Sequence, residues 1–265
     1  MRRLLITAVF VTAVMAVGSD LSAQPQTVVT DTALQFIGNW TRDTSVSRGD
    51  CGGYKDQRGN PISDCSTPFN NYPMNDRARA WLKYYDELQS PTLNECAAIT
   101  VPNLLGDVRP FGISFKTNSV VINYEQMNII RHVWMDGRQH PPATDLFQQG
   151  HAIGHWEGKD LVVETTNFTF DPDGTDEHLH MASSVRKTVI ERYHLMDENT
   201  MRLTITLQDS TFLARPFTWA FYQSKKPGGA PTAWRACDPE SGRNEVYSAY
   251  PGNKYGEDDH LGVNP

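Results

Sequence analysis

The sequence lacks most of the short motifs that identify common enzyme classes. Its 265 residues contain no G-x-G-x-x-G and no Walker A loop, which argues against nucleotide-driven chemistry. They also contain no C-x-x-C-H for covalent haem attachment, no H-E-x-x-H for a zinc protease and no G-x-S-x-G for a serine hydrolase. The sequence therefore assigns no cofactor, and the identity of any cofactor is unknown at this stage.

Positive charge is also scarce. Lys and Arg number 24 against 31 Asp and Glu, for a formal net charge of -7, and no basic run stands out. Because an acidic surface repels a phosphate backbone, we expect no nucleic-acid partner. The apolar and charged fractions, 39% and 21%, fit an ordinary globular protein better than a disordered one.

The one long apolar run is too short to span a membrane. Arg2 and Arg3 precede apolar residues 4–17, about 14 residues, where a bilayer span needs about 20. Small residues follow at 22–23, and this order is typical of a secretory signal peptide. We therefore predict cleavage after Ala23, a periplasmic or secreted location and no stable membrane insertion. Residues 24–265 are expected to form a single domain.

Cysteine is sparse, and its four residues all follow the expected cleavage site. An oxidising compartment permits disulfides, and four cysteines allow three pairings. We favour Cys51 with Cys65, because the loop between them is rich in turn formers and has no core of its own. That choice leaves Cys96 with Cys237. A four-cysteine zinc site is the alternative, but the sequence has no C-x-x-C pair.

The periodicity of the chain indicates mostly β-structure. Apolar residues at helical spacing between Asn75 and Pro91 predict one surface helix near residues 76–89. Residues 34–42 are expected to form the first strand, and short β-rich runs separated by turn formers follow Pro110. These runs are residues 111–116, 119–124, 129–135, 152–157, 160–168, 184–195, 200–208, 214–222 and 232–237.

So many strands in sequence order imply an antiparallel meander, and such a sheet removes its edges by closing. We therefore expect an all-β fold, an antiparallel meander closed into a lipocalin-like barrel with one surface helix. Lys187 and Glu191 share a strand face with Tyr193, so the faces are of mixed character. Mixed faces suit a lumen that holds a few polar side chains. The alternative is that the charged residues point to water.

Histidine is concentrated in one part of the chain, with seven of eight between residues 132 and 194. His178 and His180 form an H-x-H pair, which on a strand places both rings on one side about 7 Å apart, a spacing compatible with metal binding. The acid-rich residues 171–176 beside them do not follow the calcium-loop order. A metal site at this pair is one interpretation, and a solvated loop is the other.

Proton-transfer chemistry has candidates in the same region. A histidine near neutrality, or a carboxyl group whose pKa is raised by burial, can move protons. The candidate catalytic residues are His151, Glu164, Glu191, Asp136 and His140. The candidates for binding a small molecule are His132, Trp134, Trp156, Tyr193 and Trp219. Tryptophans are more often core residues, so the binding interpretation competes with a structural one.

The segments around these residues resemble a known family. Residues 134–141 are W-M-D-G-R-Q-H-P and residues 150–168 are G-H-A-I-G-H-W-E-G-K-D-L-V-V-E-T-T-N-F. Both look like signatures of a large family of exported bacterial proteins, and the match covers most of the chain after the signal peptide. The resemblance implies export and cysteines near positions 96 and 237, but no particular reaction. Family members often follow the second cysteine with His-Glu-Gly-Asn, whereas this chain has Asp-Pro-Glu there.

A weaker resemblance links residues 38–40, G-N-W, to the G-x-W of lipocalin-like barrels. Three function classes remain open. The meander and its mixed faces favour an exported protein that binds a small organic molecule in the barrel. The alternative is a cofactor-free or metal-assisted enzyme, a lyase, isomerase or hydrolase, in which at least two candidate residues meet with shifted pKa values. The third is a structural envelope protein with a filled barrel.

Overall fold

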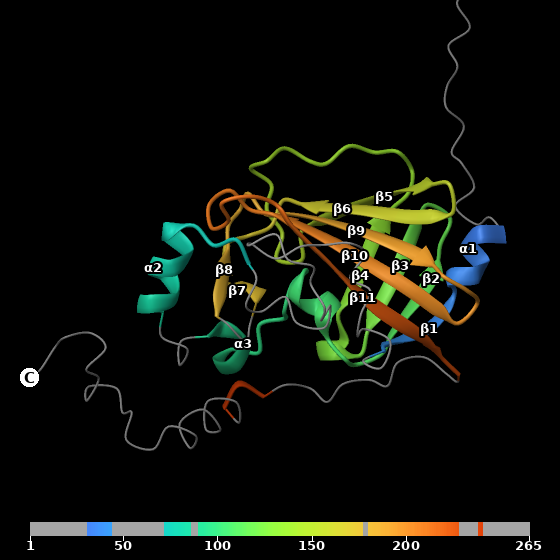
Figure 1. The fold of residues 1–265 in the computed structure, drawn as a ribbon, viewed down its shortest axis with the longest axis horizontal. Coiled ribbons are helices and arrows are strands. Elements are labelled where there is room, and N and C mark those ends of the chain that lie inside the picture. The colour runs from blue at the N-terminus through green and yellow to red at the C-terminus, as the bar shows by residue number, and fades with distance from the viewer. Residues whose placement is uncertain (1–30, 44–71, 86–89, 177–179, 228–237, 241–265) are drawn as a thin grey trace, which may run out of the picture.

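A computed structural model describes residues 31–43, 72–85, 90–176, 180–227 and 238–240. Within these ranges the chain is mostly β-structure (Figure 1). Nine strands close into a barrel in the order β1-β11-β10-β9-β6-β5-β4-β3-β2. The expected all-β, lipocalin-like barrel with a helix beside it is therefore confirmed.

Most barrel strands follow the runs expected from the sequence, with shifts of a few residues at their ends. They are β1 (Gly38–Arg42), β2 (Phe111–Phe115), β3 (Ser119–Tyr124), β4 (Ile130–Trp134), β5 (His151–Glu157), β6 (Asp160–Thr166), β9 (Thr188–Leu195), β10 (Thr200–Gln208) and β11 (Phe217–Lys226). A separate two-stranded sheet consists of β7 (Asp171–Asp176) and β8 (Met181–Ser183). The expected strand at residues 232–237 lies outside the described residues.

The helices are short and lie at the ends of the barrel. Figure 1 shows α1 (Asp31–Phe36) at one end, and α2 (Asp76–Tyr84) and α3 (Pro91–Asn94) near the other. Asn75 is the N-cap of α2, and its side-chain oxygen accepts a hydrogen bond from the Ala78 amide at 3.1 Å. In the part of the chain that the structure describes, no helix is long and apolar enough to cross a membrane.

Two local expectations differ from the structure. Residues 34–36 belong to helix α1 rather than to the first strand, and Phe36 is buried with its carbonyl accepting from Trp40 Nε1 at 2.9 Å. Residues 171–176, expected to be a loop, form β7. Thr175 Oγ1 donates to the Ala182 carbonyl of β8 at 2.9 Å.

The meander is also interrupted, because β4 and β5 pair in parallel, with Val133 opposite Ala152. Parallel neighbours need a connection of about a dozen residues or more, and residues 135–150 supply it. We call this segment the crossover loop, and Figure 1 shows it arcing over β5 and β6. The arrangement brings the loop beside the outer face of these two strands.

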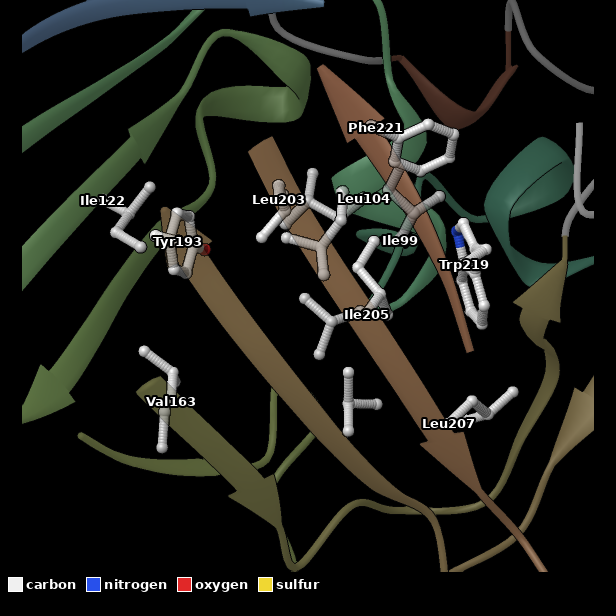
Figure 2. Packing of buried hydrophobic residues seen from close by; sticks show 14 of the residues in the cluster. Ile99, Leu104, Ile122, Val163, Tyr193, Leu203, Ile205, Leu207, Trp219 and Phe221 are labelled. Carbon is white, nitrogen blue, oxygen red and sulfur yellow. The ribbon is translucent and has the colours of Figure 1, made fainter. Parts of the chain in front are cut away.

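Alternation along the strands buries one face of each strand in the barrel. On β10 the residues Met201, Leu203, Ile205 and Leu207 are buried, whereas the residues between them are only half-buried. Figure 2 shows Leu203, Ile205 and Leu207 following one another along β10, with Tyr193 and Phe221 on neighbouring strands. Removing this apolar surface from water is the main contribution to the stability of the barrel.

The mixed faces noted in the sequence are buried rather than solvated. Lys187 and Glu191 are 1% and 0% exposed, so the alternative in which the charged residues point to water is wrong for these two, whereas it holds for Glu164, whose side chain is 45% exposed. Buried charges need partners. The partners of Glu191 lie inside the barrel, and those of Lys187 lie beside the two-stranded sheet.

Candidate functional site

Three of the five candidate catalytic residues meet on the outer face of the barrel. His151 begins β5 and Glu164 lies on the adjacent β6, while His140 comes from the crossover loop. His140 Nδ1 lies 3.0 Å from His151 Nδ1, and His140 Nε2 lies 3.2 Å from Glu164 Oε1. We call these three residues the histidine cluster.

Strand alternation explains why the cluster is outside the lumen. Ala152 of β5 and both Val163 and Thr165 of β6 are buried, so the intervening His151 and Glu164 project from the other face. The side chain of Glu164 is 45% exposed and that of His140 is 18% exposed. The cluster is therefore partly covered by the crossover loop and still reached by solvent.

The contact between the two imidazoles restricts where their hydrogens lie. Two Nδ1 atoms at 3.0 Å share one hydrogen, so one ring donates and the other accepts. His140 Nε2 is buried and lies 3.2 Å from Glu164 Oε1, but it forms no hydrogen bond with that carboxylate. In the tautomer of His140 that carries its hydrogen on Nε2, Nδ1 accepts from His151, which leaves a lone pair on His151 Nε2.

The electrostatic environment favours a neutral His151. Burial lowers the pKa of His151 below its usual 6.5, and the neighbouring His140 and Arg138 lower it further. A histidine with a lowered pKa is deprotonated near neutral pH, which is the state that accepts a proton. In the described part of the chain, no group forms a hydrogen bond with His151 Nε2.

Asp136 lies in the crossover loop, but its carboxylate is occupied. It accepts from Arg138 Nε at 2.8 Å and from Arg138 Nη2 at 2.6 Å. The same guanidinium lies 3.8 Å from the ring centroid of Trp134. Hydrogen bonds from Arg138 lower the pKa of Asp136 to about 2, so this carboxylate orients a guanidinium and is not a proton donor near neutral pH.

Glu191 lies on the opposite face of the wall, inside the barrel. It pairs with Arg131 through two bonds, from Nη2 at 2.6 Å and from Nη1 at 3.0 Å, and both side chains are buried. Tyr193 Oη donates to Glu191 at 2.6 Å, and Arg131 also donates to Thr165 Oγ1 at 3.1 Å and to Tyr124 Oη at 3.3 Å. We call these five residues the interior network. Within this network the charge of Glu191 is paired with that of Arg131, and the network is separate from the histidine cluster.

The interior network perturbs its tyrosines and contains a residue that sequence reasoning missed. Burial raises the pKa of Tyr193 well above 10, and the charge of Glu191 adds to the effect. Arg131 was not among the candidates. The sequence feature that could have identified it is the alternation along β4, in which Arg131 lies on the same face as the buried Val133. This places the guanidinium in the lumen, where a buried charge requires an acidic partner.

The five candidate ligand-binding residues do not gather in one place. Tyr193 and Trp219 are buried among the inner-face residues of β9 and β11, and Trp156 of β5 is half-buried. His132 and Trp134 lie on the outer face of β4, where their rings stack with centroids 6.1 Å apart. The described residues therefore do not bring these five side chains together in one site.

The metal and disulfide predictions are not tested by the described residues. His180 Nδ1 lies 3.3 Å from Asp173 Oδ1, while His178 lies outside the described ranges. Among the residues described, no group of three or more His, Cys, Asp or Glu side chains could hold a metal ion. Cys96 lies within the described ranges. The other three cysteines lie outside the described ranges, so the pairing stays a prediction.

The fold and the cluster together define a closed β-barrel protein with a histidine pair on its outer wall. No family model and no curated protein matches the chain. A secretary abundant heat soluble protein from Ramazzottius varieornatus is similar in structure, with 10% identity, a TM-score of 0.33, and coverage of 72% of this chain and 96% of that one.

A mutant of the fluorescent protein UnaG is also similar, with 11% identity, a TM-score of 0.32, and coverage of 74% of this chain and 99% of that one. Similarity this loose says nothing about what the present barrel binds.

Proposed function

We propose that this protein is an exported, cofactor-free enzyme that moves a proton on a small organic molecule. His151 is the general base, and His140 and Glu164 orient it. The observation that supports this proposal is the 3.0 Å contact between the two imidazoles, with the Glu164 carboxylate 3.2 Å from the far nitrogen of His140. Lyases, isomerases and hydrolases all use such a positioned base. Export is proposed from the signal-peptide pattern.

The three side chains form a chain of proton donors and acceptors that runs from His151 through His140 to the partly exposed Glu164. In the proposed relay the Glu164 carboxylate moves to accept the hydrogen of His140 Nε2, which lies 3.2 Å away, and His140 Nδ1 accepts the Nδ1 hydrogen of His151. His151 Nε2 then takes a proton from the substrate, and the positive charge that forms on its ring is stabilised by His140 and by the carboxylate behind it. A positioned base of this kind contributes typically about 10²- to 10⁴-fold in rate.

An exposed aromatic side chain lies next to this base. Phe147 of the crossover loop is 45% exposed, and its ring centroid lies 6.4 Å from that of His151. Small-molecule sites combine apolar walls with a few placed polar groups. The proposed substrate therefore has an apolar part that contacts Phe147 and an acidic hydrogen that reaches His151 Nε2.

Deuterium exchange tests this proposal without knowledge of the substrate. The purified protein is incubated in D₂O with a panel of carbonyl compounds, esters and lactones, and mass spectrometry follows deuterium uptake or cleavage. We expect wild-type activity on at least one compound and a loss of about 10²-fold or more in His151→Gln. His155→Gln is the matched control, because His155 also lies on β5 but pairs with Glu157. Activity that survives His151→Gln would contradict the proposal.

A second function, binding of a small molecule inside the barrel, is favoured by unpaired polar atoms. Gln223 of β11 is 1% exposed, and neither its amide nitrogen nor its oxygen has a hydrogen-bond partner among the described residues. The indole nitrogen of Trp219 is also buried and also has no hydrogen-bond partner among the described residues. Because buried polar groups nearly always have partners, a polar molecule or ordered water inside the barrel would supply them.

Native mass spectrometry distinguishes these two cases. A bound organic molecule gives a mass adduct on the protein as purified, and Gln223→Leu should reduce its occupancy. An unmodified mass for the wild type would contradict the carrier and would leave water as the partner of Gln223.

A further inference from the structure

Asn167 follows β6 directly and contacts the crossover loop. Its backbone has a φ of 58°, a left-handed conformation that asparagine tolerates better than most residues with a side chain. The residue is buried. An asparagine here, rather than a glycine, indicates that its side chain has a role in addition to the turn.

The Asn167 amide nitrogen lies within hydrogen-bond distance of three carbonyl groups of the crossover loop. Its Nδ2 donates to Pro142 O at 2.9 Å, to Asp145 O at 3.0 Å and to Pro141 O at 3.4 Å. Its Oδ1 accepts from Thr166 Oγ1 at 2.6 Å, which fixes the end of the amide that faces the loop. The donor end is therefore directed at the loop.

We propose that Asn167 is the positioning residue that holds His140 against His151. Pro141 and Pro142 follow His140 directly, so the carbonyls bound by Asn167 lie one and two residues from the imidazole. Proline has no N–H, so Pro141 and Pro142 cannot pair with β6 through their own amides. Within the loop, Pro142 O accepts from the Asp145 amide at 2.9 Å, and Asn167 supplies a donor from outside the loop.

The other end of the crossover loop is fixed independently of the Asn167 side chain. Gly150 has a φ of 70°, and a Cβ there would lie 2.7 Å from Thr166 O and 2.8 Å from Phe168 Cε1. The chain therefore passes close to β6 just before His151, which is then held by strand pairing with Thr166. Loss of the Asn167 amide should release His140 and leave His151 in place.

Two substitutions distinguish the role of the Asn167 side-chain amide from the role of its left-handed backbone conformation. Asn167→Asp keeps the size of the side chain but replaces the donor by an oxygen that faces three carbonyls. Asn167→Gly removes the side chain and keeps a residue that adopts a positive φ without strain. Asn123→Asp is the matched control, because Asn123 is an exposed asparagine on β3.

The readout is a pH titration of the histidine ring nitrogens by NMR, which requires no substrate. In the wild type we expect His151 to titrate below 6.5 and to share a hydrogen with His140. In both Asn167 variants the pKa of His151 should rise toward 6.5 and the shared-hydrogen signal should disappear, while Asn123→Asp matches the wild type. Wild-type titration curves in folded Asn167 variants would overturn the proposal.

The importance of the contact between Asn167 and the crossover loop rests on the proposed function. The experiments nevertheless distinguish a failure of this proposal from a failure of the proposed function. If the variants lose the imidazole contact and keep full turnover in D₂O, Asn167 positions the pair and the proposed function is wrong. If an Asn167 variant does not fold, Thr166→Val tests the same point, because it removes only the bond that orients the amide. It should shift the titration of His151 in the same direction by a smaller amount, and an unchanged titration would overturn the proposal.

Discussion

At the scale of single residues, the most informative contact is the one between two imidazoles that share a hydrogen. A lone histidine on a strand titrates near its ordinary pKa and has two accessible tautomers. In this protein the two Nδ1 atoms 3.0 Å apart require that one ring donates and the other accepts, and under the proposed mechanism the Glu164 carboxylate, 3.2 Å from His140 Nε2, favours a hydrogen on that nitrogen. The direction of proton transfer is therefore set by three side chains rather than by one.

Replacing the carboxylate should weaken the base without removing it. In Glu164→Gln the charge behind His140 is lost, so the positive charge that forms on His151 is less stabilised, and we expect kcat to fall about 10- to 100-fold with little change in KM. Steady-state kinetics on the substrate found in D₂O measures both constants. Glu157→Gln is the control, since Glu157 binds the surface residues His155 and Arg192. A reduction of equal size in the control would refute the role of Glu164.

The pH dependence of the same reaction follows from the lowered pKa of His151. Below that pKa the ring is protonated and cannot accept a proton, so kcat/KM should rise with pH, with a midpoint below 6.5, and then level off. Rate measurements from pH 4.5 to pH 8 test this. A midpoint above 6.5 would assign the base to a different group.

The interior network allows a sharper prediction about stability. Glu191→Ala leaves the buried Arg131 without its charged partner, and breaking a buried pair in this way costs about 3 to 5 kcal/mol. The double substitution Arg131→Met with Glu191→Leu removes both charges and should recover most of that loss. Urea denaturation measures each free energy of unfolding. A double variant no more stable than Glu191→Ala would show that the pair itself is stabilising.

At the scale of elements, the two-stranded sheet of β7 and β8 depends on a buried lysine. Lys187 Nζ donates to Thr100 Oγ1 and to Gly174 O, both at 3.0 Å, and lies 4.1 Å from the ring centroid of Phe168. Burial lowers the pKa of Lys187 from 10.5 to about 8, although Asp171 and Asp209 oppose the shift. The ammonium thus connects β7 to the segment before β9.

This shift makes stability depend on pH above neutrality. Between about pH 8 and pH 10 the unfolded chain still binds a proton that the folded chain has released, so the free energy of unfolding should rise with pH. The rise amounts to about 2 to 3 kcal/mol at 1.36 kcal/mol per pKa unit. Denaturation curves from pH 7 to pH 9.5 measure it, and Lys187→Met should abolish it. A flat wild-type profile would contradict the lowered pKa.

The elements also show what sequence reasoning could reach. Alternation places His151 and Glu164 on one face, and the turn formers locate most strand ends. The contact with His140 was out of reach, because a parallel pair of strands joined by an irregular loop leaves no periodic signal. Phe36 was assigned to a strand because a short apolar run does not distinguish helix from strand. Residues 171–176 pair with β8 through contacts that local propensity does not encode.

At the scale of the whole molecule, export is the property that decides the redox state of the cysteines. If residues 1–23 are removed on export, the protein isolated from the periplasm or medium begins at Gln24. Sequencing of its N-terminus checks this, and a chain that begins at Met1 would contradict the signal peptide. If export also allows the predicted pairing of Cys96 with Cys237, reduction should lower the free energy of unfolding by about 2 to 5 kcal/mol.

The wall of the barrel separates two kinds of chemistry by a single residue step. On β6, Glu164 belongs to the histidine cluster and Thr165 to the interior network. On β4, His132 is exposed on the outer face and the next inner residue, Arg131, belongs to the interior network. A substitution on one side changes acidity or recognition, and one on the other side changes folding, so the two can vary separately over evolution. Insertion of one residue within β6 would instead change both sides at once, because it would turn the outward-facing residues inward and the inward-facing residues outward. The Glu164 carboxylate would then face the lumen and the Thr165 hydroxyl would face the outside.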